Sequence, residues 1–92
     1  MSVQWLFSLI EDRKIHPIEK SYTSSLFADG LSRIAQKVGE EGTEVVVAAL
    51  AQDDQRLIEE VADLTYHTLV LLSVRGLTPK DIVAELEKRH RG

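Results

Sequence analysis

Residues 57–72 form an apolar segment that restricts the fold more than any other part of the chain. At helical spacing, apolar and threonine side chains line one face of this segment, and others such as Ala62, Leu69 and Val70 fill much of the opposite face. A helix that is apolar nearly all round has to be buried on several sides. A chain of 92 residues offers few neighbours for that burial, because small domains bury a smaller fraction of their surface. We therefore expect an all-α fold, a helical bundle of about four to five helices that is completed by oligomerisation.

Helical periodicity and capping residues divide the whole chain into short and long elements. Helices are expected over residues 3–12, from 21 or 23 up to Gly30, over 31–51, from 53 or 54 to about 75, and from 79 onward. The expected capping residues are Ser2, Ser21 or Thr23, Asp53 or Asp54, and Thr78 before Pro79. Residues 13–20 are polar and contain Pro17, which predicts a loop. No strand alternation and no repeat occurs in the sequence.

Two of these helices carry expectations about what their side chains contact. The apolar stripe of the helix over 31–51 contains Ile34, Val38, Gly42, Val45 and Ala49. Glycine at a helix interior costs about 1 kcal/mol relative to alanine, so another helix or a ligand is expected close to the backbone at Gly42. In the last helix, the side chains expected to point inward are Ile82, Val83 and Leu86.

Composition narrows the possible environments and partners. The formal charge of −4 and the pI near 5.3 argue against a nucleic-acid-binding protein, since no general positive field exists to hold a phosphate backbone. The chain lacks cysteine, which excludes disulfides, thiolate metal sites and a cysteine nucleophile. The longest apolar run is too short to cross a membrane, and the first residues do not resemble a signal peptide. A soluble, cytoplasmic protein with one domain over residues 1–92 is expected.

Two acidic pairs carry most of the functional information. Glu41 with Glu44, and Glu60 with Asp63, are each separated by three positions, so each pair projects from one face of its helix. Because the connection between the two helices is short, the helices are expected to be antiparallel neighbours, with both pairs facing each other. Like charges placed this way repel, and a divalent cation would turn that repulsion into a binding site.

The donor types indicate which ion and which ligand such a site would take. Carboxylates without cysteine favour Mg²⁺, or Mn²⁺, over zinc. A cation of this kind binds polyphosphates and activates water for attack on phosphorus. Lys37 and Arg56 lie one turn before the two acidic pairs and are candidates to contact phosphate oxygens. His67 shares the stripe of Glu60 and Asp63 and is a further candidate for substrate contact.

A structural interpretation competes with each of these assignments. A single acidic pair is more often a solvated helix face, and it is the repetition on two helices that favours a metal site. Lys37 is spaced to form an ordinary ion pair with Glu41, and a lone histidine such as His67 is more often placed at the edge of a core than used as a ligand or base. Glu40 and Glu59 point away from the two stripes and are expected to be bystanders.

The strings around the acidic pairs resemble a known family. The paired acids are similar to the metal-binding signature of the MazG-like all-α nucleoside-triphosphate pyrophosphohydrolases. The segments KSYT at 20–23, KVGEEGTEVV at 37–46, EVADLTYH at 60–67 and RGL at 75–77 narrow the resemblance to phosphoribosyl-ATP pyrophosphatase of histidine biosynthesis. The likeness extends over nearly the whole chain.

The resemblance implies a reaction and roles for its residues. It implies Mg²⁺-dependent hydrolysis between the α- and β-phosphates of phosphoribosyl-ATP, giving phosphoribosyl-AMP and pyrophosphate. The implied metal ligands are Glu41, Glu44, Glu60 and Asp63. The implied nucleophile is a metal-bound water, with Glu41 or Glu44 as the base. The implied nucleotide-contacting residues are Lys37 and Lys20, Ser21, Tyr22 and Thr23. It also implies a homodimer or larger assembly, and raises a functional association with phosphoribosyl-AMP cyclohydrolase.

Two other functions fit the same acidic pairs. A general pyrophosphohydrolase that clears non-standard nucleoside triphosphates would share the metal ligands, and only the segment at 20–23 argues against it. A non-catalytic helical interaction module would carry the acids as a solvated face. Dependence on a divalent metal distinguishes the second alternative, and substrate preference distinguishes the first.

Overall fold

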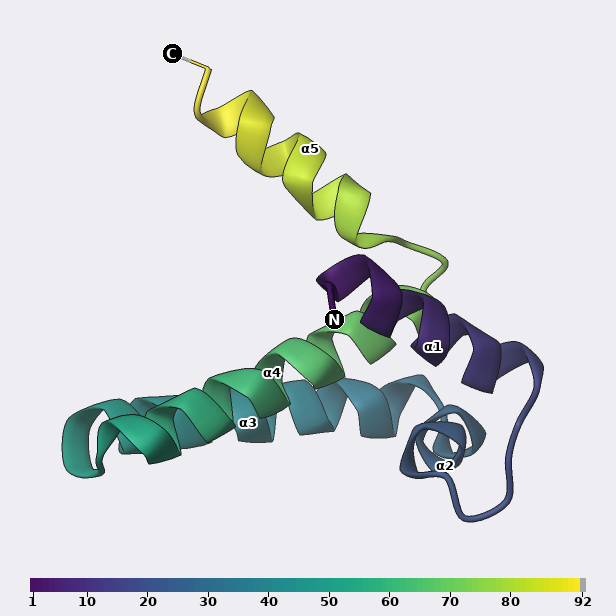
Figure 1. Ribbon diagram of the computed structural model, residues 1–92, viewed down its shortest axis with the longest axis horizontal. Helices are drawn as coiled ribbons and strands as arrows, with labels where there is room; N and C mark the ends of the chain where they lie inside the picture. The colour runs from purple at the N-terminus through teal and green to yellow at the C-terminus, as the bar shows by residue number, and fades with distance from the viewer. Residues whose placement is uncertain (92) are drawn as a thin grey trace.

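The computed structural model describes residues 1–91 and contains helices and no strands over that range. Its five helices are α1 (Val3–Ile15), α2 (Tyr22–Asp29), α3 (Leu31–Ala51), α4 (Asp54–Val74) and α5 (Pro79–Arg89). Figure 1 shows α3 and α4 lying side by side as an antiparallel hairpin, with α1 across the C-terminal end of α4 and α2 beside the start of α3. The predicted all-α fold is therefore confirmed. No helix in the described range combines the length and apolarity that a membrane crossing requires.

Side-chain caps fix where three of these helices begin. The hydroxyl of Ser2 accepts a hydrogen bond from the Trp5 backbone N–H, and the Ser21 hydroxyl accepts from that of Ser24. The carboxylate of Asp53 accepts from the Arg56 N–H in the same way. Each of these side chains satisfies an N–H group that has no partner within its own helix. The caps predicted at these positions are confirmed.

The first helix is longer than predicted, because it continues to Ile15. The loop expected from residue 13 therefore begins three residues too early in the sequence-based prediction. The Lys14 ammonium group forms an ion pair with Glu11 at 2.7 Å and donates to the Ser73 carbonyl of α4 at 2.9 Å. Ser73 in turn donates its hydroxyl to Glu11 at 2.9 Å. These contacts with a distant helix stabilise the last turn of α1, and local sequence does not reveal them.

The core lies where α1, α2 and the start of α3 meet the C-terminal half of α4. Its buried apolar residues are Phe7, Ile10, Leu26, Ile34, Leu69, Val70 and Leu72. The fully buried apolar side chains of α4 all lie in this half, whereas Ile58 and Val61 in its first half remain exposed. The near-complete apolar surface of α4 is thus covered at one end of the helix and open at the other.

The buried face of α3 differs from the stripe predicted for it. Ile34, Glu41 and Ala48 are the buried residues of this helix, whereas Ala49 is exposed. Apart from Gly42 itself, its two chain neighbours and the nearby backbone of its own helix, no heavy atom lies within 4 Å of the position that a Cβ atom would take at Gly42. The close approach expected there is therefore absent from the described residues. The helix is turned so that its acidic stripe, rather than the flanking apolar one, faces α4. Glu41 consequently enters the interface between the two helices.

Helix α5 begins as predicted but packs differently. A reciprocal capping box joins Thr78 and Asp81, and Pro79 occupies the first helical position. The prediction that Ile82, Val83 and Leu86 point into the core is wrong, since each remains about half exposed and α5 extends away from the other helices (Figure 1). Between α4, α5 and Val3 lies an open apolar groove of about 370 Å³.

Candidate metal centre

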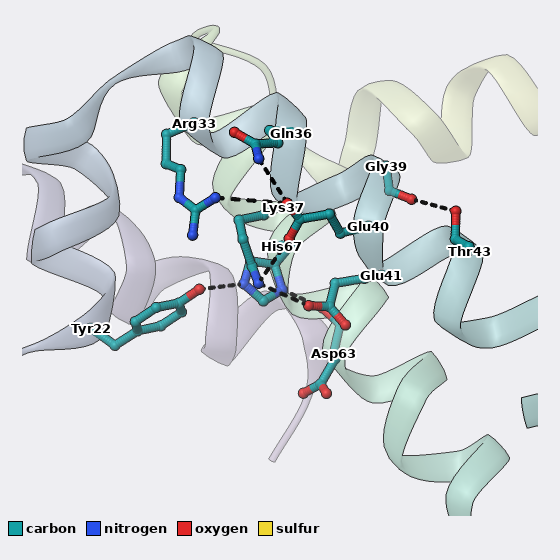
Figure 2. Close-up of polar contacts among 10 residues, drawn as sticks. All are labelled: Tyr22, Arg33, Gln36, Lys37, Gly39, Glu40, Glu41, Thr43, Asp63 and His67. Atoms are coloured by element: carbon teal, nitrogen blue, oxygen red, sulfur yellow. Dashed lines mark hydrogen bonds and ion pairs between the residues drawn. The ribbon is translucent and has the colours of Figure 1, made fainter. Parts of the chain in front are cut away.

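Three of the four predicted acidic residues meet between α3 and α4. Oxygen atoms of Glu41 on α3 and of Glu60 and Asp63 on α4 all lie within 4.8 Å of one another. The connection between the helices is only residues 52–53, which forces them to run antiparallel and brings the middle of α3 opposite the first half of α4. Figure 2 shows the side chain of Glu41 on α3 beside that of Asp63 on α4. We call Glu41, Glu60 and Asp63 the acidic cluster.

Burial makes the acidic cluster chemically unusual. Glu41 is 5% exposed and Glu60 is 4% exposed, and the Oε2 atom of each is buried without a hydrogen-bond partner among the described residues. A buried carboxylate oxygen without a partner is strongly unfavourable. Mg²⁺ and Mn²⁺ take oxygen ligands and are commonly held by carboxylates. The two bare oxygens and the adjacent Asp63 carboxylate therefore fit a hard divalent cation.

Each buried glutamate is also paired with a cation one turn earlier on its own helix. The Lys37 ammonium lies 3.2 Å from Oε1 of Glu41, and the Arg56 guanidinium contacts Oε1 of Glu60. The Glu41 carboxylate raises the pKa of Lys37 above its ordinary value. Arg56 also bonds Glu59 at 2.7 Å, which together with Glu60 raises the pKa of the guanidinium. One oxygen of each buried glutamate is thus paired and the other is left for an additional ligand.

Glu44 occupies a different position from the acidic cluster. It is exposed and lines, with Arg56 and Glu60, an open cavity of about 260 Å³ at the loop end of the hairpin. The structure therefore brings three of the four predicted ligands together and places the fourth at the rim of the neighbouring cavity.

The two acids expected to be bystanders lie outside the acidic cluster. Glu40 is exposed and contacts Arg33, Gln36 and Lys37 (Figure 2). Its hydrogen bond from Gln36, followed by that from Lys37, lowers the pKa of the carboxyl. Glu59 is exposed and bonds Gln55 and Arg56. Neither residue contributes an oxygen to the acidic cluster.

Side chains of helix α2 form hydrogen bonds with side chains of α4. The Tyr22 hydroxyl lies 2.9 Å from Nε2 of His67, as Figure 2 shows, and the Thr23 hydroxyl bonds the hydroxyl of Tyr66. His67 is buried, and its Nδ1 lies 2.7 Å from the backbone carbonyl of Asp63. Burial raises the pKa of Tyr66. Nothing in the local sequence around Tyr66 reveals Thr23 as its partner, because the two residues lie on different helices.

The other two residues of the predicted nucleotide segment lie at the entry to α2. Lys20 has a φ of 68°, the only positive value at a non-glycine residue within the described range, and Ser21 caps the helix. Both line a shallow cavity of about 530 Å³ that extends over residues 17–28.

A comparison with protein-family models decides the family of the chain. Residues 3–90 match the model described as phosphoribosyl-ATP pyrophosphohydrolase. The chain belongs to the phosphoribosyl-ATP pyrophosphohydrolase family. The resemblance found in the sequence is thereby confirmed over nearly the full length.

Curated relatives of the family agree with this placement. A protein from Clostridium botulinum named phosphoribosyl-ATP pyrophosphatase is 54% identical over 84 residues, which cover 91% of this chain and 76% of the relative. A protein of the same name from Sulfolobus acidocaldarius is 49% identical, covering 91% of this chain and 88% of the relative. The histidine biosynthesis bifunctional protein HisIE of Oceanobacillus iheyensis is 52% identical over 88% of this chain, which spans 38% of that longer protein.

Proposed function

We propose that the chain hydrolyses the bond between the α- and β-phosphates of phosphoribosyl-ATP, releasing phosphoribosyl-AMP and pyrophosphate in histidine biosynthesis. Family membership and the names of relatives from Clostridium and Sulfolobus support the substrate. The observation that carries the chemistry is the pair of buried, unpartnered oxygens on Glu41 and Glu60. A solvated acidic face would leave these oxygens in water instead.

The acidic cluster is the proposed site for Mg²⁺, with Mn²⁺ as a substitute. Glu41, Glu60 and Asp63 would hold the ion, and Glu44, which lines the neighbouring cavity with Glu60, is the fourth proposed ligand. A cation bound there would neutralise phosphate charge and acidify a coordinated water. The chain itself supplies the surroundings, because the glutamates are buried and exclude bulk water from one side of the site.

The remaining residues are assigned by position. Lys37 and Arg56 flank the acidic cluster on opposite helices, and their ammonium and guanidinium groups are suited to phosphate oxygens. Glu44 is exposed beside the cluster, so its carboxylate, like that of Glu41, is a candidate to accept a proton from an attacking water. Lys20, Ser21, Tyr22 and Thr23 are the proposed nucleotide segment at the head of α2.

The assembly and the surroundings of the protein are also proposed. Exposed apolar side chains on α3, α4 and α5 support a homodimer or larger homo-oligomer. Alignment of this chain with part of the bifunctional HisIE proteins supports a functional association with phosphoribosyl-AMP cyclohydrolase. A place in amino-acid biosynthesis and a cysteine-free sequence fit the reducing cytoplasm.

Substrate competition provides the test. Purified protein should release pyrophosphate from phosphoribosyl-ATP with Mg²⁺ present, and should do so with a higher kcat/KM than from a panel of ordinary and modified nucleoside triphosphates. Higher kcat/KM values for the panel would instead make the protein a general pyrophosphohydrolase. Absence of turnover with every substrate and metal would support a non-catalytic module.

A further inference from the structure

Two adjacent hydrogen bonds join α2 to α4. Tyr22 bonds His67, and Thr23, the residue after Tyr22, bonds Tyr66, the residue before His67. Backbone packing of α2 is against α1 and α3, so side chains make the connection to α4. One end of this connection is the proposed nucleotide segment, and the other lies one turn from Asp63 in the acidic cluster.

The acceptor at Asp63 fixes which nitrogen of His67 carries hydrogen. A backbone carbonyl can only accept, so Nδ1 donates its hydrogen across the 2.7 Å to Asp63. In the neutral imidazole Nε2 then offers a lone pair, and the Tyr22 hydroxyl donates to it across 2.9 Å. The bonds run in one direction, from Tyr22 through His67 to the backbone of Asp63. Both ring nitrogens are engaged, which leaves neither for a substrate.

The surrounding rings hold this chain of hydrogen bonds in place. The ring centroids of Tyr22 and Tyr66 are 6.2 Å apart in a stacked arrangement, and those of Tyr66 and His67 are 5.0 Å apart edge to face. His67 is 5% exposed. Hydrogen bonds shielded from water are stronger and more directional than exposed ones.

We infer that Tyr22 and His67 are positioning residues that fix the distance and orientation between the nucleotide segment and the metal-binding carboxylate of Asp63. This inference rests on the proposed function, since it assigns one end to the nucleotide and the other to the metal. We call the hydrogen bonds from Tyr22 through His67 to the Asp63 backbone the relay. The relay fixes positions and transfers no proton: it holds the α-phosphate end of a bound nucleotide at a fixed distance and orientation from the acidic cluster. Misplacement of reacting groups by about 1 Å can lower a rate by about 100-fold.

Variants that remove one bond of the relay at a time provide the experiment. Tyr22→Phe deletes the hydroxyl, His67→Asn keeps a nitrogen near the δ position only, and His67→Gln keeps one near the ε position only. Thr65→Val is the matched control, because among residues 1–91 the Thr65 hydroxyl bonds only the Val61 carbonyl of its own helix. Three readouts are measured for each variant: kcat and KM for phosphoribosyl-ATP, Mn²⁺ affinity from the electron paramagnetic resonance signal of the free ion, and ¹⁵N shifts of the imidazole nitrogens.

The expected result is a fall in kcat of about 10- to 100-fold for Tyr22→Phe and for either His67 variant, with Mn²⁺ affinity unchanged. The double variant with Tyr22→Phe and His67→Asn should be no slower than the slower single variant, because both changes remove the same hydrogen bond between Tyr22 and His67. In the wild-type protein the ¹⁵N shifts should report hydrogen on Nδ1 of His67, and the Nε2 signal should move in Tyr22→Phe.

Other outcomes overturn the inference. Wild-type kcat in Tyr22→Phe, multiplicative losses in the double variant, or hydrogen on Nε2 in place of Nδ1 would each exclude the relay. A parallel loss of Mn²⁺ affinity would make His67 a support of the metal site alone. If the wild-type protein fails to hydrolyse phosphoribosyl-ATP, the proposed function fails, while the ¹⁵N shifts still decide whether the relay exists.

Discussion

The α3–α4 hairpin contains two regions in which the usual distribution of side chains is reversed. In the acidic cluster, Glu41 and Glu60 are 5% and 4% exposed. Near the hairpin loop, Val46, Leu50 and Ile58 are 56%, 83% and 61% exposed. Charged residues are rarely buried without full pairing, and large apolar groups rarely gather on the surface of an isolated subunit. We call the exposed side chains Val46, Val47, Leu50, Ile58 and Val61 the apolar patch.

The difference between the two regions is what each lacks. The acidic cluster is short of positive charge, since Lys37 and Arg56 each pair with only one oxygen of a buried glutamate. The apolar patch lacks other apolar side chains packed against it. A small cation would satisfy the first region and a second protein surface would satisfy the second, so we propose that one hairpin carries both a ligand site and an assembly site.

The largest expected effect is on the acidic cluster. Glu60→Gln keeps the shape of the side chain but removes a metal-binding charge, and it should lower kcat/KM for phosphoribosyl-ATP by on the order of 10³-fold, because metal coordination supplies several kcal/mol of transition-state stabilisation. Glu59→Gln is the matched control on the adjacent position and should retain activity. Equal losses in the two variants would remove the distinction between buried ligand and exposed bystander.

The next effect concerns the apolar patch. If the apolar patch is an interface between subunits, Leu50→Lys places a charge in that interface. The substitution should weaken self-association by about 100-fold or more. Sedimentation velocity over a range of concentrations measures this change. Gln52→Lys adds the same charge beyond the patch and should leave the assembly intact. A wild-type protein that sediments as a monomer at all concentrations would contradict the assignment of the patch.

Adding Mg²⁺ to the intact protein should act on the acidic cluster and leave the apolar patch unaffected. Mg²⁺ at about 100 times its Kd should stabilise the fold by about 2.7 kcal/mol, which for a domain of this size raises Tm by roughly 10–20 °C. Chelation with EDTA should reverse the shift, which differential scanning calorimetry measures. Sodium chloride of equal ionic strength is the control, because an equal shift with Na⁺ would indicate screening of repulsion rather than a bound ion.

The smallest expected effect concerns Lys37, whose ammonium group pairs with Glu41. Lys37→Met should destabilise the metal-free protein by about 1 kcal/mol, measured by urea unfolding. Because the pKa of Lys37 is raised in the folded state, this contribution is complete below the unfolded value near 10.5 and disappears as the pH rises through the folded one. Mg²⁺ should narrow the difference between the two proteins. A difference that is constant with pH and metal would make the contribution of Lys37 one of packing alone.

Local signals explain why so much of the fold was predictable from the sequence. Ser2, Ser21 and Asp53 cap helices through bonds to residues three positions away, a range that sequence patterns capture. The meeting of Glu41 with Asp63 follows from spacing plus a short connection. The helix caps and the meeting of the two carboxylates both depend on residues that lie close together in the sequence.

What escaped prediction depends on distant partners. The last turn of α1 relies on Lys14 contacting Ser73, and the bond between Thr23 and Tyr66 joins two different helices. The exact rotation of α3, which buries Glu41 and leaves Glu44 exposed, is a result of packing that periodicity alone leaves undetermined. The half-exposed face of α5 violates the expectation of an inward stripe for the same reason.

The short connection at residues 52–53 has a consequence for folding order. Closing a small loop costs little chain entropy, and structures rich in contacts local in sequence form quickly. All three carboxylates of the acidic cluster lie within this one hairpin. The proposed metal site could therefore form before α1 and α5 dock, and a cation bound at that stage would stabilise the folding chain through its most local element.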